Sequence, residues 1–132
     1  MLVGLSKSQF IRGLQCPKSL WLLKNRPELQ MPMDTATQLK RDQGSMVGIL
    51  GQQLFPGGNT IAYNPQNFAE MLSATRQLLA DGATTIYEAA FSFDDIFVKV
   101  DIFHLGESGW VINEVKGSTE VKEVYLDDVA VQ

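Results

Sequence analysis

The segment GWVINEVKGS, residues 109–118, contains two opposite charges inside a run of apolar residues. Glu114 and Lys116 are two positions apart, so both side chains would lie on the same face of a β-strand. Burying a charge costs free energy unless it is paired or binds a metal. A carboxylate that holds a divalent cation, beside a lysine that meets a phosphate oxygen, is the combination that phosphodiester hydrolysis requires. The alternative is a surface ion pair on a half-exposed strand, which the E-x-K triplet alone favours because such triplets are common by chance.

The strands expected before this segment supply further carboxylates. Three segments rich in β-forming residues predict a three-stranded antiparallel meander, over residues 84–93, 96–105 and 109–118. If residues 94–95 and 107–108 are two-residue hairpin loops, Glu88 lies across from Asp101, and Asp101 lies across from Glu114. A three-residue loop would shift the register by one and separate these side chains.

A row of three carboxylates on one face predicts a metal site. Like charges directly opposite one another destabilise a sheet, and a divalent cation would neutralise them. Carboxylate oxygens suit Mg²⁺ or Mn²⁺. We therefore expect Asp101 and Glu114 to bind the metal, with Glu88 flanking. Lys116, one pleat further along, would meet a phosphate oxygen or polarise a water.

The helices and strands that position these residues are predicted from the spacing of apolar residues and from helix start signals. Residues 1–82 predict helices, with start signals at Ser6 with Gln9, Pro17, Asp34 and Pro65. Residues 83–132 predict the sheet and then the start of a helix in VKEVYLDDVAVQ. The order indicates a single α/β (α+β) domain over residues 1–132, with N-terminal helices packed on the sheet.

Composition and charge limit the classes of function. A chain of 132 residues with 45% hydrophobic and 20% charged residues is typical of one soluble globular domain. No signal peptide or membrane-spanning stretch is recognisable, and there is one cysteine, so we expect a cytoplasmic protein without a membrane partner. Residues 1–63 carry a net charge of +4 and residues 81–132 a net of −8. This asymmetry suits a cation site beside an anion-binding surface, although charge alone favours ordinary solvated faces.

Asp101, twelve intervening residues and then Glu114-Val115-Lys116 resemble the D…E-x-K signature of the PD-(D/E)XK nuclease superfamily. The tail YLDDVAVQ resembles the helix that follows it, whose glutamine belongs to the site in RecB-like members. The segment LSKSQFIRGLQCPKSLWLLKNRPEL resembles the N-terminal segment of an uncharacterised bacterial family related to RecB-like and CRISPR-associated exonucleases. The similarity covers essentially the whole chain.

This resemblance implies a restriction-endonuclease-like core and Mg²⁺-dependent cleavage of DNA. Asp101, Glu114 and the Val115 carbonyl would hold the metal. Lys116 would orient or activate the water and stabilise the transition state, and Gln132 would assist. A non-catalytic nucleic-acid-binding or scaffold module with the same fold is the alternative.

Two departures from the family bear on activity. Gly48 stands where RecB-like members often carry a histidine ligand, so the metal set is incomplete unless Glu88 serves instead. The family also continues beyond the position of Gln132, so we expect this chain to be part of a longer protein and to cleave weakly by itself.

Other residues carry weaker expectations. Cys16 resembles the first cysteine of an iron–sulfur cluster in related nucleases, but a cluster needs about four ligands. With one cysteine in the chain, a half-buried thiol is favoured unless a longer protein supplies the others. Lys7, Arg12 and Lys18 are candidates for contacts with DNA phosphates, with solvated helix faces as the alternative.

Overall fold

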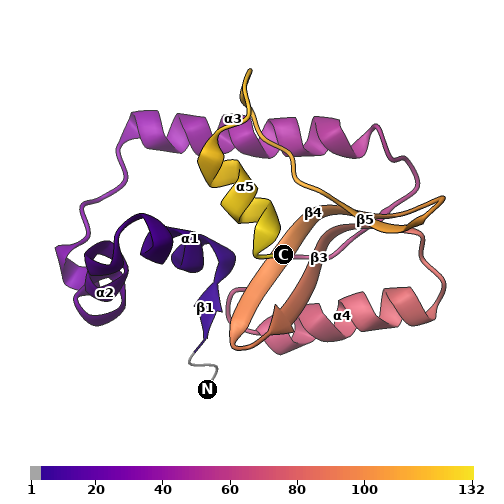
Figure 1. Cartoon of the computed structure of the whole chain (residues 1–132), viewed down its shortest axis with the longest axis horizontal. Coiled ribbons are helices and arrows are strands. Elements are labelled where there is room, and N and C mark those ends of the chain that lie inside the picture. The colour runs from indigo at the N-terminus through magenta and orange to yellow at the C-terminus, as the bar shows by residue number, and fades with distance from the viewer. Residues whose placement is uncertain (1–3) are drawn as a thin grey trace.

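The computed structural model describes residues 4–132 and has a mixed α/β architecture (Figure 1). The helices are α1 (Lys7–Gln15), α2 (Pro17–Asn25), α3 (Thr35–Gln52), α4 (Phe68–Ala80) and α5 (Glu123–Ala130), with a 3₁₀ turn, η1, at Pro27–Leu29. The strands are β1 (Leu5–Ser6), β2 (Asn59–Thr60), β3 (Thr85–Phe93), β4 (Ile96–Gly106) and β5 (Gly109–Asn113).

The sheet is mixed, and larger than the three strands expected. β4 pairs antiparallel with β3 and with β5. Two short strands add in parallel, β1 on β4 and β2 on β3. Because β3 occupies one edge of β4, β1 and β5 share the other edge. Strands of two residues are too short to produce a hydrophobic period, which is why the sequence did not predict them.

The predicted register of the long strands is confirmed. Phe93 pairs with Ile96 and Gly106 pairs with Gly109, so both hairpin loops contain two residues. The first loop, residues 94–95, has positive φ at both positions, as a type I′ turn requires.

Two predicted boundaries differ from the structure. β5 ends at Asn113 instead of continuing to residue 118, so Glu114 and Lys116 lie just beyond the strand. Helix α4 begins at Phe68 instead of near Pro65, because the Asn67 side chain accepts the N–H of Glu70 and caps the helix there.

The core lies between α4 and the sheet. Met71 of α4 packs with buried residues of the sheet and with Ile61, which follows β2. Thr75 connects the two layers by hydrogen bonds, because its hydroxyl donates to the Met71 carbonyl and accepts the N–H of Ala90. This packing fixes β3, and through it the strand that carries Asp101.

Helix α3 runs on the other side of the sheet from α4 (Figure 1). None of its residues is buried, although Gly51 near its end approaches Val115 closely. Helix α5 packs against α1. Among the described residues, no helix combines the length and the apolar character needed to cross a membrane.

Candidate functional site

The Glu114 carboxylate is enclosed, since its side chain keeps 7% of its surface exposed. Its Oε1 atom lies 3.0 Å from Lys7 Nζ and 3.0 Å from Lys116 Nζ. Its Oε2 atom accepts a hydrogen bond of 2.9 Å from Gln132 Nε2. The structure therefore brings Glu114, Lys116 and Gln132 together, as predicted, and adds Lys7 from α1.

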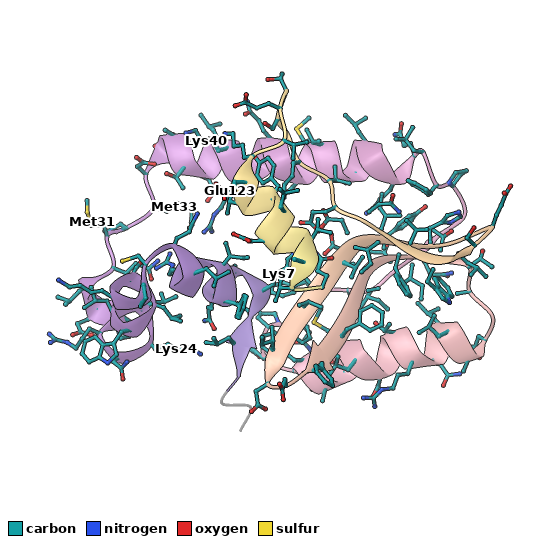
Figure 2. The ribbon with its side chains drawn as sticks, viewed as in Figure 1. Lys7, Lys24, Met31, Met33, Lys40 and Glu123 are labelled. Carbon is teal, nitrogen blue, oxygen red and sulfur yellow. The ribbon has the colours of Figure 1, made fainter. Side chains whose placement is uncertain are left out.

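Asp128 also belongs to this cluster, and sequence reasoning missed it. Lys7 Nζ lies 3.2 Å from Asp128 Oδ1, and Lys116 forms an ion pair with Asp128 Oδ2. Lys7, labelled in Figure 2, thus connects α1 with α5. The available signal was spacing: Asp128 precedes Gln132 by four residues, which puts both on one face of a continuous helix, and the Gln132 amide contacts the Asp128 carbonyl although α5 ends at Ala130.

These ion pairs favour the charged forms of Asp128 and Lys116. Burial alone would raise the pKa of Asp128, but the hydrogen bond from Lys116 and the charge of Lys7 hold it below its usual value. Burial alone would lower the pKa of Lys116, but hydrogen bonds to Asp128 and Glu114 raise it. Lys116 is therefore an ammonium ion, with three N–H groups of which two are engaged.

Asp101 has a different environment from Glu114. Its Oδ2 atom accepts the N–H of Val115 at 2.7 Å, so a side chain replaces the backbone acceptor just beyond the end of β5. Burial raises the pKa of Asp101, and the charges of Glu114 and Glu88 add to this effect. Within residues 4–132 no lysine or arginine forms a salt bridge with Asp101.

Glu88 flanks Asp101, as the register predicts. The pairs Tyr87 with Ile102 and Ala89 with Val100 stand on either side of Glu88 and Asp101, which are not themselves paired in the ladder but line the same cleft. Glu88 has a φ of 59°, a conformation that is uncommon for a residue other than glycine and that often marks functional sites.

The Glu88 carboxylate is paired with a cation. Its Oε2 atom lies 2.7 Å from Lys99 Nζ, which also sits 4.6 Å from the centre of the Tyr63 ring. Glu88 is thus engaged on the cleft wall and is a less available ligand than Asp101.

A cleft of about 780 Å³ contains most of the predicted site. Its sheet side is lined by Glu88, Asp101, Glu114, Val115 and Lys116. Its opposite side belongs to α3 and includes Gly48. A Cβ atom at position 48 would meet no other atom within 4 Å, so a side chain there would have free space.

A second cleft of about 650 Å³ lies on the other side of the cluster. Glu114, Lys116 and Lys7 line both clefts and separate them. Arg12 and Cys16 line only the second cleft and a smaller cavity of about 290 Å³ beside it, which Lys18 also borders. The half-buried thiol expected at Cys16 is wrong, because Cys16 is exposed in the connection between α1 and α2. Lys7 is engaged in ion pairs instead of lying on an open helix face.

The chemistry of the donors fits one cation between Asp101 and Glu114. Each carboxylate oxygen has two lone pairs, and only one of the four on Asp101 is used by a protein donor. Glu114 Oε1 serves both lysines, whereas Glu114 Oε2 serves Gln132 alone. Among the described residues, however, no three His, Cys, Asp or Glu side chains converge closely enough to form a metal cage.

A scan of protein-family models, a search of curated proteins and a search of solved structures each find no match for this chain. Membership of the PD-(D/E)XK superfamily therefore stays a prediction from the motif.

Proposed function

We propose that this domain is a metal-dependent nuclease of the PD-(D/E)XK type, with a restriction-endonuclease-like core, that hydrolyses phosphodiester bonds in DNA. The observation that supports this most strongly is the contrast between two adjacent carboxylates in one cleft. Glu114 is paired with lysines, whereas Asp101 is half-buried, faces other carboxylates and forms no ion pair within the described residues. A divalent cation would relieve that repulsion.

The metal would be held by a small set of oxygen atoms. Asp101 and Glu114 Oε2 have lone pairs that the protein leaves free, and the Val115 carbonyl belongs to the segment between Glu114 and Lys116. Glu88 would act as a further ligand only after leaving Lys99. When bound, Mg²⁺ or Mn²⁺ would lower the pKa of a coordinated water and offset negative charge on the phosphate.

Two side chains of the protein, Lys116 and Gln132, would assist the reaction. Lys116 lines the cleft, and its ammonium charge would meet a phosphate oxygen as negative charge develops there. Gln132 fixes Glu114 Oε2 by its side-chain amide. Its buried Oε1 atom has no partner in the described part of the chain, so it is a free acceptor within the site.

A non-catalytic nucleic-acid-binding module is the second candidate. The ion pairs that engage Lys116 and the glycine at position 48 favour it, because both reduce what the site offers to a metal and a phosphate.

Single-turnover cleavage and metal calorimetry distinguish the two candidates. With Mn²⁺ and excess protein, we expect slow cleavage of single- or double-stranded DNA. Lys116→Met should lower the rate at least 100-fold, because general charge stabilisation of this kind contributes about 10²–10³. It should leave Mn²⁺ binding intact, since lysine is not a ligand. Glu114→Gln should remove both.

The matched control is Lys40→Met, on the exposed surface of α3 (Figure 2), which should change neither measurement. Absence of Mn²⁺ binding at millimolar metal contradicts the metal site. Binding of Mn²⁺ and DNA without any cleavage that depends on Lys116 supports the binding module instead.

A further inference from the structure

Four charged side chains form a closed charge ring: Lys7, Glu114, Lys116 and Asp128. Each lysine contacts both carboxylates, and each carboxylate contacts both lysines. The ring joins α1, the segment after β5, and α5, which are far apart in the sequence. Two positive and two negative charges make it neutral.

The ring is enclosed in a way that ordinary surface pairs are not. The side chains of Lys7, Glu114 and Asp128 keep 16%, 7% and 12% of their surface exposed, and that of Lys116, at the edge of the ring, keeps 33%. By comparison, the ion pair of Arg26 with Glu28 keeps 52% and 57%. Solvent screening is weaker at an enclosed pair, so changes of charge within the ring should be felt at nearby sites.

The two lysines occupy the same oxygen of Glu114. Because Lys7 and Lys116 both contact Oε1, the ring uses that atom fully and leaves Oε2 with the hydrogen bond from Gln132. Asp128 receives the other contact of each lysine, so it fixes where both ammonium groups stand.

We infer that Lys7 and Asp128 are positioning residues of the site: they hold Lys116 and Glu114 in a ring whose net charge sets how strongly Glu114 Oε2 would bind a divalent cation. This inference rests on the proposed function for its metal and adds two residues that act through others. Lys7 thus acts as a fixed counter-charge within the site, and Asp128 limits how strongly the two lysines compete with the cation for Glu114.

The ring predicts that removing Lys7 and removing Asp128 change the affinity for Mn²⁺ in opposite directions. Lys7→Gln leaves the ring with a net charge of −1 and frees part of Oε1, so Mn²⁺ should bind about tenfold more tightly. Asp128→Asn leaves a net of +1 and two lysines on Glu114 alone, so Mn²⁺ should bind about tenfold more weakly. The expected change in affinity is of this size because a unit charge close to a partly buried ion shifts a binding equilibrium by roughly one to three powers of ten. The double variant restores neutrality and should bind Mn²⁺ as the original chain does.

The first measurement is Mn²⁺ calorimetry on the whole chain, with Lys7→Arg as the conservative variant that keeps the charge and the affinity. Opposite shifts for the single variants, with recovery in the double variant, support the inference. The inference is overturned if both single variants change the Mn²⁺ affinity in the same direction. It is also overturned if the double variant binds Mn²⁺ more weakly than either single variant.

The second measurement needs neither metal nor activity. Urea unfolding of the metal-free single and double variants should be non-additive, because removing the second member of a pair costs less once the first is gone. The decrease in the urea midpoint of the double variant should therefore be smaller than the sum of the decreases in the two single variants. Additive losses overturn the ring even if the domain cleaves DNA. If no variant binds Mn²⁺ but the losses are non-additive, the ring stands as a structural clamp, and both the positioning role and the proposed function fail.

Discussion

Asp101 and Glu114 are neighbouring carboxylates with different surroundings. Glu114 is surrounded by donors, so its negative charge is balanced within the protein. Asp101 has one backbone N–H and two carboxylates for neighbours, and burial raises its pKa. Asp101 therefore has no ion-pair partner among residues 4–132, although the charge of Lys7 acts on it from a distance.

This contrast predicts how stability depends on pH. The pKa of Asp101 is higher in the folded protein than in the unfolded chain, so the folded state binds its proton more tightly. Its contribution to stability is fully present below the unfolded pKa and is lost as pH rises through the folded pKa. We expect Asp101→Asn to stabilise the metal-free protein at neutral pH by about 1 kcal/mol, with no gain at acid pH.

Urea unfolding at several pH values in the presence of a chelator tests this expectation. Asp42→Asn, on the exposed surface of α3, is the matched control and should show no such dependence. A loss of stability at neutral pH in Asp101→Asn would mean that the carboxylate is favourable there without a metal.

At the scale of elements, the last two turns of α3 decide what the cleft contains. Gly51 permits the close approach of α3 to the chain after β5, because a Cβ atom there would lie 2.9 Å from the Val115 side chain. One turn earlier, Gly48 faces the cleft with free space around it. A histidine at position 48 would therefore point into the same cleft as Asp101 and Glu114.

Gly48→His should add a ligand and tighten Mn²⁺ binding by about tenfold, since imidazole binds first-row divalent ions, and the gain should be larger for Ni²⁺ or Zn²⁺, which prefer nitrogen ligands more than Mn²⁺ does. Calorimetry measures the affinity. Gln43→His is the control, because it lies at an exposed position of α3 that does not line the cleft. Equal effects of the two substitutions would place the metal away from Asp101.

At the scale of the whole molecule, the site joins parts of the chain that no local interaction connects. The carboxylates come from the sheet and its end, one lysine from α1, and Asp128 with Gln132 from the C-terminal helical segment. A cation bound here would bind the folded state only, because the unfolded chain does not hold these groups together.

Mg²⁺ or Mn²⁺ should therefore raise the melting temperature. At a metal concentration one hundred times the dissociation constant, the free energy of unfolding should increase by about 2.7 kcal/mol, a shift of several degrees. Thermal unfolding with and without metal measures it, and Asp101→Asn should abolish the rise. Glu107→Gln, in an exposed turn, should leave it unchanged. An equal rise in the Asp101 variant would assign the stabilisation to another site.

The sequence by itself determined the register of the long strands, although neither Glu88 with Asp101 nor Asp101 with Glu114 forms a pair of the observed ladder. Two-residue turns and the alternation of strands are local properties, so the register of β3, β4 and β5 could be worked out from the positions of polar residues, and the structure has that register. The grouping of Glu114, Lys116 and Gln132 also agrees with the motif.

Only the tertiary structure decided which charges balance those carboxylates. Lys7 was expected on an open helix face, and Asp128 was not singled out, because the angle at which α1 and α5 meet the sheet depends on packing between distant segments. The short strands β1 and β2, and the end of β5 at Asn113, depend on the same kind of contact. Local patterns specify which face of an element a residue occupies, whereas the partner on the opposite side is selected by the packing of the whole chain.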